Sequence, residues 1–186
     1  GTLSSSVPQT VKRSTFGVLK NVDKNVSLQP VTTLSIGDIV DSDGLGIVVW
    51  KSYDDSSYML MSVEEVQGYN WTLASNWCSK YGEGWRMPDI AELSLIHDEF
   101  TTINTVLGGL GYTQLSTANK CYWSCTANPS SSDYYYRERL YDGLVLKNTG
   151  GDEYYASTAN YTRAIKLIGN AAYEDFTGLC LEAIED

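Results

Sequence analysis

Few residues in this sequence have the types and spacing that acid–base or nucleophilic chemistry needs. His97 is the only histidine among the 186 residues, and no aspartate or cysteine stands at a recognisable catalytic spacing from it. A nucleophilic side chain needs a neighbouring base to take its proton, and nothing in the spacing pairs His97 with Cys78. We therefore expect His97 to be a surface or boundary residue of a helix, and we expect no enzymatic activity.

The four cysteines, Cys78, Cys121, Cys125 and Cys180, permit two disulfides but do not have zinc-binding spacing. If Cys121 and Cys125 lie on one strand, they are separated by about 13 Å, which is too far for a disulfide between them. Any bridge must then reach Cys78 or Cys180. Free buried thiols remain an alternative, above all for Cys78.

The acidic turn Asp41-Ser42-Asp43-Gly44 resembles the start of a calcium-binding loop. Its glycine is in the fourth position, however, and the twelfth position is Ser52 instead of glutamate. The sequence also lacks phosphate-binding glycine loops and the nucleophile-elbow motif. We therefore expect no metal and no cofactor.

The stretch from Gly84 to Leu93 predicts the start of a helix. Pro88 forces the residue before it into an extended conformation, and Asp89 stands where an N-cap residue belongs. Glu92, three residues later, completes a capping box. The stretch therefore has a structural explanation that requires no catalysis.

Tyrosines are concentrated in the second half of the chain, where eight of the fourteen lie between Tyr122 and Tyr161 among Ser, Asn and Asp. Tyrosine offers large contact area at low entropic cost, which is typical of binding surfaces. The alternative is that tyrosines simply favour strands, and one face of 134–136 must point inward. The candidate ligand-binding residues are Tyr134, Tyr135, Tyr136, Arg137, Arg139, Tyr154 and Tyr155.

Hydrophobic periodicity predicts the elements that would position these residues. Helical spacing covers 71–81 and 90–97, with a shorter helix near 102–107 and a terminal one in 171–186. Strand patterns cover a hairpin at 36–50 and strands at 58–63, 121–126, 134–141, 144–147 and 162–168, with loops at 127–133 and 149–160. Short β patterns at 16–19 and 26–28 precede them. This order predicts an α+β fold with mixed or antiparallel sheets.

The charge balance excludes one class of partner. The net charge of −10 repels phosphate backbones, so we expect no nucleic-acid binding. No stretch approaches 18 consecutive apolar residues, so we expect no transmembrane segment.

Four pieces of the sequence occur together in an order that resembles a known family. They are the hairpin 37–48, Trp77-Cys78 on a helix, the stretch 84–93, and Tyr122-Trp123-Ser124-Cys125-Thr126 followed by Arg163-Ala164-Ile165. The pattern resembles bacterial surface domains named after the C-terminal domain of a collagen-like adhesin, whose motifs are Trp-Arg-Leu-Pro-Thr-x-x-Glu-Leu and Tyr-Trp-Ser-Ser-Thr. Here Met87, Asp89 and Cys125 replace a leucine, a threonine and a serine.

The resemblance implies a C-type-lectin-like fold, related to that of the formylglycine-generating enzyme, over residues 36–168. Residues 1–35 would form an N-terminal extension, and 169–186 an acidic tail. In such a fold Trp85 fills the core, Pro88 and Asp89 start the second helix, and Arg86 pairs with a buried acid or with carbonyl groups.

The calcium-binding triplets of sugar-binding lectins are missing from the sequence, and the cysteines match no motif of the enzyme relatives. The resemblance therefore implies the fold, without the calcium site or the oxidase chemistry. We expect a secreted or outer-surface binding module, with a lipid anchor left open, that recognises a glycan or protein ligand. A structural subunit of a surface assembly and a formylglycine-generating-type oxidase are the alternatives. Ligand identity and oligomeric state stay open.

Overall fold

The computed structural model describes residues 33–129, 131–147 and 160–169. The chain divides into two units, 1–32 and 33–186, and all of the described residues belong to the second. The strands expected at 16–19 and 26–28, the loop at 149–160 apart from Asn160, and the helix in 171–186 lie outside the described residues.

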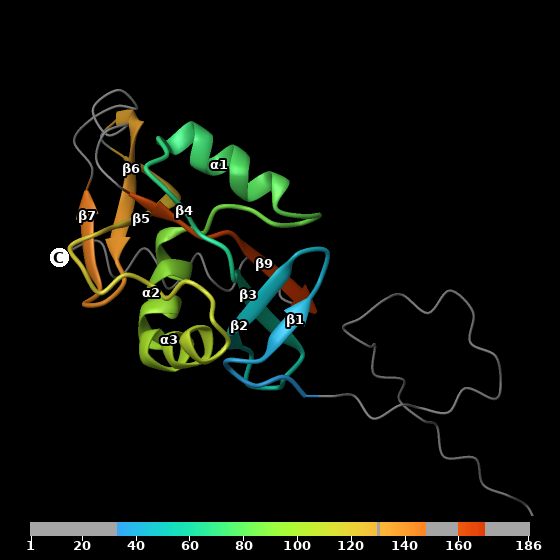
Figure 1. The fold of residues 1–186 in the computed structure, drawn as a ribbon. Helices are drawn as coiled ribbons and strands as arrows, with labels where there is room; N and C mark the ends of the chain where they lie inside the picture. The colour runs from blue at the N-terminus through green and yellow to red at the C-terminus, as the bar shows by residue number, and fades with distance from the viewer. Residues whose placement is uncertain (1–32, 130, 148–159, 170–186) are drawn as a thin grey trace, which may run out of the picture. The chain divides into compact units, whose positions relative to one another are not determined.

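Two sheets form the β part of the described chain (Figure 1). The first is antiparallel, with strand order β1-β2-β3-β9: β1 (Ile39–Asp41), β2 (Leu45–Lys51), β3 (Ser57–Ser62) and β9 (Ile165–Gly169). The second has the order β4-β8-β5-β6-β7 and is mixed, because β5 runs parallel to β8. Its strands are β4 (Val66–Gln67), β8 (Tyr161–Thr162), β5 (Tyr122–Asn128), β6 (Ser131–Arg139) and β7 (Leu144–Lys147).

Three helices lie between the strands of the first half and those of the second: α1 (Trp71–Lys80), α2 (Ile90–Asp98) and α3 (Phe100–Gly109). The Asn70 side chain caps α1 by accepting a hydrogen bond from Leu73 N at 2.8 Å. The predicted α+β class is therefore confirmed. None of the helices in the described ranges is long and apolar enough to cross a membrane.

Strands β2 and β3 are buried on both faces, which explains why their sequences lack a polar alternation. Side chains alternate between two apolar clusters. One cluster includes Ile47 and Met59 and is completed by α2 and α3. The other includes Val48 and Leu60 and is completed by α1 and Trp85. The first sheet is therefore the central layer of the core.

The stretch before α2 is a structural clamp, as the sequence indicates. The side chain of Asp89 and that of Glu92 form a reciprocal capping box. Arg86 donates to both carboxylate oxygens of Glu92, at 2.8 and 2.5 Å, and Glu92 is buried. The expectation that Arg86 pairs with a buried acid is confirmed. Its backbone also bridges Ile165 of β9, so the clamp joins α2 to the first sheet.

The single strand expected over 162–168 is wrong, because the chain changes sheets at Arg163 and Ala164. Tyr161 and Thr162 belong to the second sheet, whereas β9 belongs to the first. The guanidinium of Arg163 is buried at this crossing and donates to the carbonyls of Ser62 and Val63 and to the Glu65 carboxylate. These partners precede it by about a hundred residues, so local patterns do not reveal them.

The β5–β6 hairpin is longer than expected. Strand β5 continues to Asn128 and β6 begins at Ser131, so most of the expected loop 127–133 lies within the two strands. The pairing is irregular between Trp123 and Ala127. At this bulge Cys125 N donates to Pro88 O at 2.8 Å, which connects β5 to the start of α2. The short strand β4 is not predicted by the sequence.

Candidate functional site

Side chains of β6 alternate between two environments, and the alternation divides the candidate residues. Tyr135, Arg137 and Arg139 share one face, which we call the β6 surface together with Trp71 of α1 and Tyr141 of the following turn. Tyr135 stacks on Trp71 with ring centroids 3.8 Å apart and an interplanar angle of 11°. The Trp71 indole donates to Ser124 O of β5 at 2.8 Å, so the stack is fixed to the sheet.

Both arginines of the β6 surface already have polar partners. Arg137 donates to the side-chain oxygen of the buried Asn160 at 3.0 Å. Arg139 donates to Asn119 at 2.6 Å and makes a two-pronged contact with Asp142, and its guanidinium lies 4.9 Å from the centroid of the Tyr141 ring. Hydrogen bonding from Arg139 lowers the pKa of Asp142. The guanidinium groups are therefore held in position.

The other candidate residues do not join this surface. Tyr136 is only 2% exposed and packs in the cluster beneath α2 and α3, so it is not accessible to a ligand. Tyr134 is half-buried and shares that opposite face of β6 by alternation. Tyr154 and Tyr155 lie outside the described residues. The structure thus brings together Tyr135, Arg137 and Arg139.

A buried acid lies on the opposite face of β6. Glu138 has no exposed surface and accepts a hydrogen bond from Ser94 of α2 at 3.0 Å. Burial raises its pKa to about 7. His97 is half-buried and its Nδ1 atom lies 2.7 Å from Leu140 O, which confirms the expectation of a boundary residue. These contacts connect α2 to β6.

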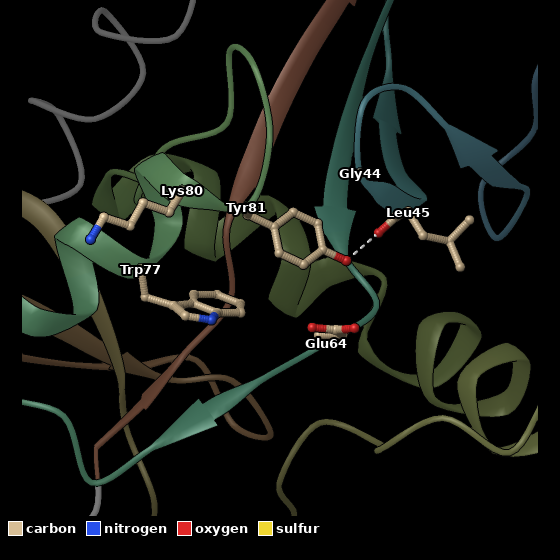
Figure 2. Close-up of a pocket in the computed structure, with 6 residues that line it drawn as sticks. All are labelled: Gly44, Leu45, Glu64, Trp77, Lys80 and Tyr81. Carbon is tan, nitrogen blue, oxygen red and sulfur yellow. Dashed lines mark hydrogen bonds between the residues drawn. The ribbon is translucent and has the colours of Figure 1, made fainter.

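A second feature was not predicted from the sequence: a pocket of about 350 Å³ beside the end of α1 (Figure 2). The rings of Trp77 and Tyr81 lie 5.4 Å apart with a tilt of 50°. The Tyr81 hydroxyl donates to Leu45 O at 2.7 Å. Burial, and then the charge of Glu64, raise the Tyr81 pKa. We call this feature the α1 pocket, and its lining residues are Gly44, Leu45, Glu64, Trp77, Lys80 and Tyr81.

Part of the α1 pocket has a sequence signal, although its assembly does not. Helical spacing over 71–81 places Trp77 and Tyr81 on the same helix face. The hairpin turn at Gly44 and the segment after β3 complete the pocket, and they come from 13 to 37 residues away in the sequence. Only tertiary packing brings these three segments together.

The described cysteines are free thiols: Cys78, Cys121 and Cys125. Burial raises the pKa of Cys78 to about 12 and that of Cys125 to about 11. Both therefore stay protonated at neutral pH, whereas a nucleophilic thiol needs a lowered pKa. Cys180 lies outside the described residues. Within the described ranges, no three His, Cys, Asp or Glu side chains gather as metal ligands would.

Comparison with models of known protein families gives no match for this chain, and comparison with curated proteins gives none either.

Proposed function

We propose that this protein is a binding module with a C-type-lectin-like fold, secreted or on the outer cell surface, which recognises a glycan or protein ligand through its β6 surface. The observed α+β architecture, with three helices and two sheets in the described residues, is compatible with that fold. The motifs around Arg86 and Trp123 support it.

The observation that carries this proposal is the stacked pair of Trp71 and Tyr135 beside two oriented arginines. Tyrosine, tryptophan and arginine are the residue types that contribute most often to binding energy at interfaces. Their side chains are held by Ser124, Asn160 and Asp142 before any ligand arrives. Binding therefore has a small ordering cost, because few rotamers remain to be fixed.

A catalytic role has weaker support. An oxidase of the formylglycine-generating type uses reactive cysteines, as the resemblance implies, whereas burial raises the pKa of Cys78 and Cys125 here. These thiols have the properties of core side chains. We therefore place the function in recognition.

The test is an array of glycans and matrix proteins probed with the full chain. We expect at least one ligand whose binding Tyr135→Ser weakens about tenfold or more, because the stacked contact area is lost. Tyr53→Ser is the matched control, since Tyr53 is fully exposed in the turn between β2 and β3. Ligands bound equally by the Tyr135→Ser variant and the original chain would contradict the role of the β6 surface.

A structural subunit of a surface assembly is the second candidate, and one observation favours it. In the described part of the chain β7 is the last strand of the second sheet, and Leu144 on it is 43% exposed. Unpaired strand edges can pair with another chain. Light scattering of the full chain should then show oligomers that Leu144→Lys converts to monomers. A concentration-independent monomer would exclude this candidate.

A further inference from the structure

We propose that the α1 pocket is a second, separate ligand site, which binds one neutral sugar ring by stacking it against Trp77. This site is distinct from the β6 surface and does not depend on it. Trp77 and Tyr81 follow the Trp71 end of α1 by one to three helical turns. The pocket is lined by Gly44 and Leu45 of the β1–β2 turn (Figure 2), and its lining includes no residue of β6.

The side of the α1 pocket formed by Tyr81 and the β1–β2 turn is held by several contacts. Tyr81 is held by its hydrogen bond to Leu45 O and by an edge contact with Trp85, with ring centroids 4.8 Å apart. The Trp85 indole donates to Asp43 O at 3.0 Å, and the Asp43 carboxylate accepts from Glu83 N at 2.6 Å. These bonds connect the β1–β2 turn to the chain that follows α1. The pocket is therefore formed before any ligand enters it.

Gly44 permits this close assembly. Its φ angle is +127°, and a Cβ atom there would lie 2.8 Å from Trp85 Nε1 and 3.1 Å from two ring atoms of Tyr81. Only glycine adopts such a backbone conformation readily and leaves this space. The turn can therefore approach the two aromatic rings.

The Tyr81 hydroxyl and the Leu45 carbonyl of the pocket bind each other, whereas three other polar side chains of the lining make no such contact. Within the described residues, no hydrogen bond or ion pair joins the side chains of Glu64, Lys80 or Trp77 to another residue. Glu64 and Lys80 are exposed, and Trp77 is half-buried. The pocket thus presents acceptors from a carboxylate, donors from an ammonium group, and the donor and flat face of an indole.

This combination of groups matches a neutral polyhydroxyl ring better than a charged ligand. Glu64 and Lys80 carry opposite charges, so each attracts the ions that the other repels, and together they give no preference for a ligand with a single charge. A sugar would place its apolar C–H face on the indole and direct hydroxyls to the Glu64 carboxylate, with the exposed Lys80 side chain, which extends away from Glu64 in Figure 2, reached only at the outer edge of the ligand. Charge-assisted hydrogen bonds of this kind are stronger than neutral ones.

The size of the pocket sets the extent of the ligand. Small-molecule sites have volumes of roughly 300–1,000 Å³, and the α1 pocket, at about 350 Å³, is at the lower end. One sugar ring therefore fits, and further units of a glycan would extend into solvent. Because the charged groups are exposed, we expect weak binding, with a dissociation constant on the order of 1 mM.

The test uses the full chain and the methyl glycosides of glucose, galactose, mannose and N-acetylglucosamine, observed by saturation-transfer NMR and calorimetry. We expect saturable binding of at least one glycoside. Trp77→Ala should weaken it about tenfold or more, and Glu64→Gln or Lys80→Met about threefold to tenfold each. Tyr53→Ser should leave it unchanged, because Tyr53 is fully exposed in the turn between β2 and β3 and lines neither the α1 pocket nor the β6 surface.

Several results would overturn the proposal. One is the lack of binding by any of the four glycosides up to their solubility limits. Another is preferential binding of phosphorylcholine or inorganic phosphate, which would indicate a site for charged ligands. If Trp77→Ala lowers the melting temperature, the double variant Glu64→Gln, Lys80→Met decides, since both side chains are exposed. Unchanged glycoside affinity in that variant would place the sugar elsewhere.

Discussion

The β6 surface and the α1 pocket are both built on α1, but they differ in how their polar groups are satisfied. At the β6 surface, Arg137 and Arg139 already bind Asn160, Asn119 and Asp142. In the α1 pocket, the side chains of Glu64 and Lys80 make no hydrogen bond or ion pair with another described residue. The first region is therefore preorganised by its own contacts, whereas the second leaves its hydrogen-bonding capacity to a ligand.

This difference has an energetic consequence for binding. A ligand at the β6 surface must either stack on the exposed edges of the rings or compete with existing ion pairs. A ligand in the α1 pocket displaces only water from exposed charged groups. We therefore expect large, flat ligands on the β6 surface and small, hydroxyl-rich ones in the pocket.

The largest expected effect comes from removing the stack of Trp71 and Tyr135 at the β6 surface. Trp71→Ala removes the ring beneath Tyr135 and the hydrogen bond to Ser124 O, and we expect it to lower the free energy of unfolding by about 3 kcal/mol. Urea unfolding at neutral pH measures this. Trp71→Phe is the matched control, because it keeps a ring for Tyr135 and should cost about 1 kcal/mol for the hydrogen bond alone. Equal costs for both variants would show that the stack contributes nothing.

The second effect concerns the opposite face of β6, where burial raises the pKa of Glu138 from 4.5 to about 7. Between these pH values the folded protein keeps a proton that the unfolded chain releases. The free energy of unfolding should therefore fall as pH rises from 4.5 to 7, by up to about 3 kcal/mol for this group.

Glu138→Gln removes this titration, and its side-chain oxygen can still accept from Ser94. Urea unfolding of both proteins at several pH values should show the added loss of stability only in the original chain. Identical pH dependence in the two proteins would mean that Glu138 is ionised in the folded state at an ordinary pKa.

The smallest expected effect is a difference in stability between alanine variants of two glycines, one near each region. Gly44 borders the α1 pocket, and Gly143 lies in the turn after β6, where a Cβ atom would lie 2.8 Å from His97 Nε2. Gly143 has a φ of +70°, which alanine adopts at a cost of roughly 1–2 kcal/mol, whereas the φ of +127° at Gly44 is less accessible. We expect Gly44→Ala to be the more destabilising variant by about 1–2 kcal/mol, measured by urea unfolding. A larger loss of stability in Gly143→Ala would show that the β1–β2 turn accommodates a Cβ atom at Gly44 at little cost.

Local signals predicted the parts of the fold that are determined locally. The capping box at Asp89 and Glu92 lies within four residues, and the hairpin at Gly44 has its turn residues in the sequence itself. The split of the strand expected over 162–168 could not be predicted, because Arg163 is held there by Ser62 O and Val63 O, which precede it by about a hundred residues. Alternation along a strand is local, but the packing partner of each face is not.

The candidate site shows the same limit. The sequence indicated that one face of 134–136 points inward, but it did not show which face. Tyr136 is the buried one because α2 and α3 cover that side, and Tyr135 meets Trp71 because α1 covers the other. The α1 pocket has no single motif, since its lining comes from a turn, an extended segment and a helix end.

The position of β9 determines when this domain can be completed during synthesis. Strand β3 pairs with β9 on one side, so Tyr58 meets Ile168 and Met61 meets Ile165 more than a hundred residues later. A nascent chain that ends before residue 160 would expose the edge of β3 and leave the carbonyls of Ser62 and Val63 without Arg163. The first sheet can therefore be completed only after β9 has emerged from the ribosome.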